Sequence, residues 1–340
     1  MASSRVPDNL PAYNPNKSTL AFGDRALPKI RRELSSGDVE VIQQALLLLN
    51  DLLHKPENIT SAVREGLVNS LSLLLISDDS VIKYRSGSCL QLIAEHALGR
   101  QAFLKLNIIN SLSRLFVDPE PLVRLHSHLA VEMCGRTKEG VQGLLDNGLI
   151  PILVERFISE QQIELKVASL ESLHWCLMAD PVPGLECRAI ERLQPSLTAE
   201  VADVKWRIAR CLYDLTVPHS GKRTACDCGL VKDLVPLLAD DHHLVKTHAA
   251  SVLMSIAVIT EGKYALLNEE GLDKLVSLLA DTTPAVRLNA VKALTLLAEA
   301  PSGKEKLMKS LNEVTELEGD SDDVIAKAAA TAKKTITWLP

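Results

Sequence analysis

The apolar positions of this chain recur in the same order about every 41 residues. A glycine followed by apolar residues at helical spacing opens four of the segments, and weaker copies of the same pattern open three others. These starting residues are Gly66, Asn107, Gly148, Ala189, Gly229, Gly271 and Leu311, which lie 41, 41, 41, 40, 42 and 40 residues apart. A period of this length is typical of the armadillo and HEAT helical arrays.

One repeat can be followed most clearly from Gly271. Residues 272–279 have the apolar spacing of a short helix, and residues 281–284 (DTTP) predict a turn. Pro284 suits the first position of a longer helix, which is expected to continue to Ala298 and to end at residues 301–303, before another brief helix. Three helices per repeat indicate armadillo units, because HEAT repeats use two. The recurring glycines are expected to take a left-handed conformation between helices.

The sequence therefore predicts an all-α fold, a right-handed superhelical armadillo-repeat solenoid of about seven to eight three-helix repeats. Residues 1–22 are predicted to form an extended N-terminal arm, and residues 23–340 the solenoid. Its units start near residues 23, 66, 107, 148, 189, 229, 271 and 311. The acidic stretch 312–318 is expected in a terminal capping repeat. Residues 181–184 (PVPG) and Trp206 disturb the pattern, and drift, a kink or a docking surface would each explain them.

Charge and cysteine content narrow the classes of partner and compartment. The net charge of −6 and pI of about 5.9 give no broad basic field, so neither nucleic acid nor a membrane is an expected partner. The seven cysteines follow no disulfide spacing, and residues 1–13 lack an apolar signal segment. We therefore expect an intracellular protein of the cytoplasm.

No catalytic signature is present in the sequence. It lacks a phosphate-binding glycine loop, a His-Glu-x-x-His motif and a Gly-x-Ser-x-Gly motif, so we expect no enzyme activity, cofactor or small-molecule substrate. Cys226 and Cys228, near His219 and the pair His242–His243, are the best metal candidate. A zinc site needs two ligand pairs that converge, so structural cysteines are the favoured interpretation. A zinc or redox enzyme stays as an alternative that metal analysis would test.

A series of basic residues follows the same period at the start of each third helix. Its members are Lys83, Arg124, Lys166, Lys205, Lys246 and Arg287, at steps of 41, 42, 39, 41 and 41 residues. They could form a stripe for an acidic partner. They could instead form internal ion pairs with the acids six residues earlier, which are Asp118, Glu160, Asp240 and Asp281. The internal interpretation is favoured, because stacked repeats commonly hold one another through such pairs.

The third helices are expected to line the concave surface, where two positions per repeat, four residues apart, would face a partner. This phase gives the candidate partner-binding row Asp51, Ser88, Met133, Glu171, Trp175, Arg210, Asp214, Ser251, Ser255 and Lys292. The nuclear-import adaptors of this fold place Trp and Asn at these positions in successive repeats. This row lacks both ladders, so import-cargo binding is not expected.

Several segments resemble one family more closely than the general repeat. They are residues 258–265 (VITEGKYA), residues 286–303 (VRLNAVKALTLLAEAPSG), residues 99–104 (GRQAFL), and the N-terminal series Pro11, Pro15, Lys17, Ala21, Gly23, Arg25, Ala26 and Leu27. Together they are similar to the radial spoke head protein 14 homolog family of motile cilia. The resemblance extends over essentially the whole chain. It is strongest in residues 243–303 and weak in residues 120–225, so partner contacts of the middle repeats are not carried over.

This resemblance implies a non-catalytic scaffold subunit of the axonemal radial spoke in motile cilia and flagella. The implied partners are other radial spoke subunits, with axonemal doublet-associated proteins as further candidates, and the implied location is the axoneme. The N-terminal arm would dock on another subunit. The alternative function is a soluble armadillo adaptor that binds extended peptides in its concave groove, in transport or signalling.

Overall fold

The computed structural model describes residues 25–338, which are organised as α-helices and short 3-10 helices without a strand. The all-α class expected from the sequence is therefore confirmed. The chain divides into two compact units at residues 134 and 135. The expected N-terminal arm, residues 1–22, lies outside the described residues. Within the described part, every helix is too short or too polar to cross a bilayer.

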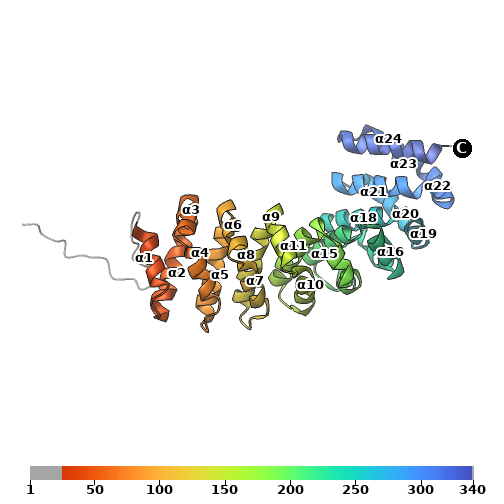
Figure 1. Cartoon of the computed structure of the whole chain (residues 1–340). Helices are drawn as coiled ribbons and strands as arrows, with labels where there is room; N and C mark the ends of the chain where they lie inside the picture. The colour runs from red at the N-terminus through yellow and green to blue at the C-terminus, as the bar shows by residue number, and fades with distance from the viewer. Residues whose placement is uncertain (1–24, 339–340) are drawn as a thin grey trace, which may run out of the picture. The chain divides into compact units, whose positions relative to one another are not determined.

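The first unit consists of shorter and longer helices, and from the third helix on two shorter helices precede each longer one (Figure 1). Its long helices begin at residues that can cap or open a helix, for example Asp38, whose side chain accepts hydrogen bonds from the amides of Glu40 and Val41. Its helices are α1 (Ala26–Glu33), α2 (Val39–Leu53), α3 (Pro56–Arg64), α4 (Leu67–Leu74), α5 (Ser80–Ala94), α6 (Ala97–Lys105), α7 (Ile108–Ser113) and α8 (Pro121–Gly135), the last ending at the boundary.

The second unit continues this order of two shorter helices and one longer helix, except that three very short helices precede its second longer helix (Figure 1). Its first part contains α9 (Lys138–Asp146), α10 (Leu149–Ser159), α11 (Ile163–Ala179), α12 (Val182–Glu186), α13 (Ala189–Leu193), α14 (Ser196–Ala199) and α15 (Ala202–Leu215). Its second part contains α16 (His219–Asp227), α17 (Leu230–Leu237), α18 (His243–Ile256), α19 (Thr260–Asn268), α20 (Gly271–Ser277), α21 (Pro284–Leu297), α22 (Pro301–Leu307), α23 (Leu311–Glu316) and α24 (Asp323–Thr337).

The long helices of the second unit pack on one another in sequence order. Helix α11 contacts α15, α15 contacts α18, α18 contacts α21, and α21 contacts α24. Each buries aliphatic side chains at helical spacing, as α21 does with Val286, Ala290, Val291, Ala293, Leu294 and Leu297. The core is therefore a continuous row of small aliphatic contacts between successive helices. Pro284 opens α21 as expected, whereas residues 301–303 begin α22 instead of ending α21.

Six junctions before the second helix of a repeat are left-handed, with one change of register from the glycine positions, whereas the last junction, at Ser310, has φ −107°. Gly66, Gly148 and Gly229 have φ values of 76°, 63° and 71°. Gly271, however, is the first residue of α20, and the left-handed residue is Glu270, with φ 57°. The left-handed residues 66, 107, 148, 188, 229 and 270 thus lie 41, 41, 40, 41 and 41 residues apart. The left-handed conformation therefore recurs more regularly than glycine does. Arg188 and Glu270 adopt it at junctions where glycine would do so without strain.

Candidate protein-binding surface

The basic series forms ion pairs between successive repeats. In the first unit the Lys83 ammonium pairs with Asp118. In the second unit Lys166 pairs with Glu200, and Lys246 pairs with Asp281. Lys205 lies 3.4 Å from Asp240, and Arg287 binds both oxygens of Asp320 at 2.7 and 3.0 Å. These side chains are largely buried, so the series holds helices together and is not an open basic stripe.

The partner of each base differs from the expected one. Lys83, Lys166, Lys205, Lys246 and Arg287 each pair with the acid of the next repeat, 33 to 35 residues later, instead of the acid six residues earlier. The position six residues earlier contributes its backbone: Arg124 and Arg287 each donate to the carbonyl of Asp118 and Asp281, both at 2.9 Å. The reason is geometric, because adjacent third helices bring the start of one helix beside the turn that precedes the next.

A second basic series, not predicted from the sequence, contacts backbone carbonyls at the carboxyl ends of the long helices. Lys222 donates to the carbonyl of Val217, and Lys263 lies 3.5 Å from the carbonyl of Val258. In the first unit Arg100 donates to the carbonyls of Ala94 and Glu95, both at 2.8 Å. Cations are favourable at the carbonyl ends of helices. The signal that could have found this series is Gly-Arg or Gly-Lys at residues 99–100, 221–222, 262–263 and 303–304.

The residues of the predicted partner-binding row lie on the long helices, but they differ in what they contact. Asp51 and Lys292 are exposed, on α2 and α21. Met133 and Trp175 are half-buried, on α8 and α11. Ser88 accepts a hydrogen bond from Asn50 at 2.8 Å, and Ser251 accepts one from Asn289 at 2.7 Å. Only part of this row is therefore open to a partner.

The row members Asp214 and Ser255 are buried and already hydrogen-bonded. Ser255 donates to the carbonyl of Thr216 at 2.9 Å, which links α18 to the end of α15. Asp214 lies 2.6 Å from Nδ1 of His174, which links α15 to α11. Burial raises the pKa of Asp214, and the contact with His174 offsets part of that effect. Both side chains are therefore engaged within the protein and are little exposed to a partner.

A charged cluster joins α11 and α15 around Glu171 and Arg210 of the row. The two Glu171 oxygens accept from Arg207 at 2.6 Å and from Arg210 at 2.7 Å. Burial acts to raise the pKa of Glu171, but the two guanidinium groups outweigh it and hold that pKa below its usual value. Arg207 also lies 4.0 Å from the centre of the Trp206 ring. The charges of this cluster are satisfied within the protein.

Trp206 extends this cluster to α18, since its ring stacks on His248 with 5.5 Å between ring centres. Burial, followed by the nearby Arg210 and His174, lowers the pKa of His248 to about 4. Trp206 disturbs the repeat pattern in the sequence, and its place cannot be predicted there because its stacking partner His248 lies on another helix. The structure shows that it packs between two long helices.

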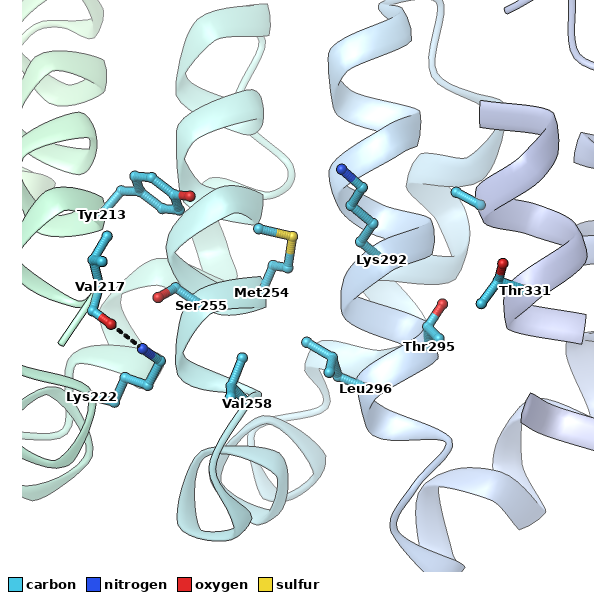
Figure 2. Close-up of a pocket in the computed structure, with 11 residues that line it drawn as sticks. Tyr213, Val217, Lys222, Met254, Ser255, Val258, Lys292, Thr295, Leu296 and Thr331 are labelled. Carbon is cyan, nitrogen blue, oxygen red and sulfur yellow. Dashed lines mark hydrogen bonds between the residues drawn. The ribbon is translucent and has the colours of Figure 1, made fainter. Parts of the chain in front are cut away.

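Two cavities lie on the face of the long helices that carries the predicted partner-binding row. A cavity of about 490 Å³ is lined by residues of the charged cluster, including His174, Arg210, Asp214 and His248. The next, of about 530 Å³, lies across α15, α18, α21 and α24 (Figure 2). Figure 2 shows its lining residues, which are Tyr213, Val217, Lys222, Met254, Ser255, Val258, Lys292, Thr295, Leu296, Ala328 and Thr331. We call this second cavity the lysine groove. It contains two row members, Ser255 and Lys292.

Cys226 and Cys228 belong to no cluster of metal-ligating side chains among the described residues. Burial raises the pKa of Cys226 to about 11, and the Cys228 thiol lies 3.5 Å from the carbonyl of Ala225. Within residues 25–338 no group of three or more His, Cys, Asp and Glu side chains is arranged to hold a metal ion. The pair lies at the end of α16, just before the left-handed Gly229.

Comparison with known proteins identifies the fold but not the function. No family model matches the chain. A crystal structure of an engineered protein is similar over 92% of this chain and 79% of that chain, with a TM-score of 0.85 and 23% sequence identity. A second engineered protein covers 79% of this chain with 22% identity, but its TM-score of 0.47 is too low to indicate a common fold. The chain therefore has a helical architecture that a solved structure shares.

Proposed function

We propose that this chain is a non-catalytic armadillo-repeat scaffold that joins other proteins. The observation that supports this proposal most directly is the 41-residue recurrence of left-handed junctions and inter-repeat ion pairs. Repeats that contact mainly their neighbours form extended surfaces, and such surfaces commonly serve protein binding. In this proposal the described helices belong to a right-handed superhelical solenoid of about seven to eight three-helix repeats.

The cellular role that fits best is a subunit of the radial spoke in motile cilia and flagella. Support comes from the resemblance of residues 258–265 and 286–303 to the radial spoke head protein 14 homolog family. In this role the chain is cytoplasmic and axonemal and bridges other spoke subunits, with doublet-associated proteins as further partners. No nucleic acid, membrane or small molecule is involved.

Fractionation of ciliated cells tests this role. The tagged chain is expressed, the ciliary membrane is removed with detergent, and the axoneme is washed with moderate salt. The expected result is retention in axonemes of normal cells and loss from axonemes of spokeless mutants. Release with the detergent-soluble matrix, or accumulation in the nucleus, would contradict the spoke role.

An adaptor that binds extended peptides is the second candidate, and the lysine groove is the observation that favours it. The groove crosses four successive long helices, and it exposes apolar side chains beside lysines. In the fractionation experiment an adaptor would leave with the soluble matrix while still binding peptide in vitro. The two candidates therefore differ in where the chain is found.

A further inference from the structure

Lys222 and Lys263 occupy the same position in successive repeats, 41 residues apart, but their surroundings differ by one side chain. Lys263 forms an ion pair of 2.7 Å with Glu299, just beyond the end of α21. The position that corresponds to Glu299 beside Lys222 is 41 residues earlier, and it is Val258. Lys222 therefore lacks the carboxylate that its neighbour has. Its ammonium contacts the carbonyl of Val217, and no carboxylate of the described residues pairs with it.

The surroundings of Lys222 leave its positive charge uncompensated. The side chain is 8% exposed, and it lines the lysine groove, to which no aspartate or glutamate contributes. Burial lowers the pKa of Lys222, as expected for a cation without an acidic partner. Figure 2 shows Lys222 and Val258 at the same end of the groove. A carboxylate that entered there would meet a buried cation at a position where Glu299 meets Lys263 in the next repeat.

The remainder of the groove is suited to apolar side chains. Val217 and Val258, which follow the ends of α15 and α18, are 57% and 53% exposed. Met254 of α18 and Leu296 of α21 also line the groove. Lys292, on α21, is the second lysine of the groove, and unlike Lys222 it is exposed. Exposed apolar surface bordered by polar groups is typical of protein-binding sites. The groove thus combines apolar surface with positive charge on a chain whose net charge is −6.

We propose that the lysine groove binds an extended segment of a partner protein that places an aspartate or glutamate carboxylate on Lys222 and apolar side chains against Val217, Val258 and Leu296. The inference rests on the proposed role as a protein-binding scaffold, and it specifies the chemistry of one partner. A basic segment is disfavoured, because it would meet two lysines and no acid. The carboxylate of the partner replaces the one that Val258 does not supply.

The test uses the purified full-length chain and a phage library of random twelve-residue peptides. Selected peptides are expected to contain an acidic residue flanked by apolar residues. The best peptide is then synthesised with a fluorescent label, and its affinity is measured by fluorescence anisotropy. Lys222→Met should weaken binding at least roughly tenfold, because it removes one partner of a buried charge pair. Replacing the acidic residue of the peptide by its amide should have a similar effect.

A matched pair of variants at Val258 separates charge from shape. Val258→Glu supplies an internal carboxylate in the manner of Glu299 and should abolish peptide binding without lowering the melting temperature. Val258→Gln, of nearly the same size as glutamate but uncharged, removes only the apolar contact and should weaken binding about fivefold, far less than Val258→Glu. Circular dichroism of each variant verifies that the helices remain folded.

Three results would overturn the inference: no peptide is enriched, the enriched peptides are basic, or their binding is unchanged by Lys222→Met and Val258→Glu. Binding by a second copy of the chain would also overturn it, and would appear as a concentration-dependent dimer in sedimentation. These outcomes are independent of the spoke role. A chain that stays with the axoneme but binds no acidic peptide would contradict only the inference about the groove.

Discussion

In the second unit, the face of the long helices that carries the predicted partner-binding row differs between the first part and the second part. It is filled by internal polar pairs in the first and is open in the second. Between α11 and α15, the face is occupied by pairs within the protein, such as Glu171 with Arg207 and His174 with Asp214. Between α15 and α24, the same face leaves Lys222 without an acidic partner and Lys292 exposed. The first part also has three helices of only four or five residues, α12 to α14.

This difference shows that the repeat can lose helix length and still keep its register. The junction at Arg188 remains left-handed, and Lys166 still pairs with the next repeat through Glu200. Polar pairing on this face of the long helices accompanies the shortened helices α12 to α14. Where the helices have normal length, that face is available for binding. The regular part of the molecule, and not the irregular one, therefore carries the candidate binding groove.

The largest expected effect comes from adding a methyl group at two glycines that occupy similar positions in the two parts. A Cβ at Gly262 would lie 2.1 Å from the carbonyl oxygen of Ile256, so the backbone itself must move. A Cβ at Gly184 would meet side-chain methyl groups, those of Leu177 and Leu215 at 2.5 and 2.7 Å and that of Ile150 at 3.7 Å, which can move more readily than backbone. Gly262→Ala should lower the free energy of unfolding by roughly 2–4 kcal/mol, and Gly184→Ala by about 1 kcal/mol. Urea denaturation measures both, and equal losses would show that the two parts are packed alike.

The next effect concerns the ion pairs between repeats. Lys246→Met leaves Asp281, whose side chain is 8% exposed, without its cation and should cost about 2 kcal/mol of unfolding free energy. Lys166→Met does the same to Glu200 in the irregular part and should cost a similar amount. The exposed pair Arg188–Glu191 is the control, and Arg188→Met should change stability little. A negligible loss for Lys246→Met would mean that the pairs do not hold the repeats together.

The charged cluster makes stability depend on pH through His248. Burial, with Arg210 and His174, lowers the pKa of His248 to about 4 from the usual 6.5, so the folded protein resists the proton that the unfolded chain accepts. Between these values the unfolded state binds more protons, and stability falls as the pH is lowered. The expected loss from pH 7 to pH 5 is about 1–2 kcal/mol. His248→Phe keeps a ring beside Trp206 and should flatten the pH profile of urea denaturation; an unchanged profile would exclude this residue as the cause.

The smallest effect tests the junctions. Glu270 is left-handed, so Glu270→Gly should raise the free energy of unfolding by about 0.5–1 kcal/mol. Gly229→Ala is the opposite change at the preceding junction and should lower it by about 1 kcal/mol, because its Cβ would meet no atom but its φ of 71° disfavours alanine. Thermal melts of the two variants should shift in opposite directions. Shifts in the same direction would contradict the left-handed assignment.

The sequence predicts the parts of this structure that repeat in residue type. The three-helix order follows from apolar spacing, and the left-handed junctions at Gly66, Gly148 and Gly229 follow from glycine. The junction at Glu270 could not be placed, because an adjacent glycine draws the assignment one residue forward. The basic series was predicted, but its partners in the next repeat depend on how neighbouring helices face one another. Trp206 and His248 are related only through that packing.

The ion pairs of the periodic basic series run in one direction, with the base in the earlier repeat and the acid in the later one. Any fragment excised between two repeats of the second unit would therefore expose an acid without its base at its first end and a base without its acid at its last end, for example Asp240 and Arg287. Two such fragments have complementary ends. We expect them to associate head to tail, as heterologous interfaces do, so chains truncated at repeat junctions should form short polymers.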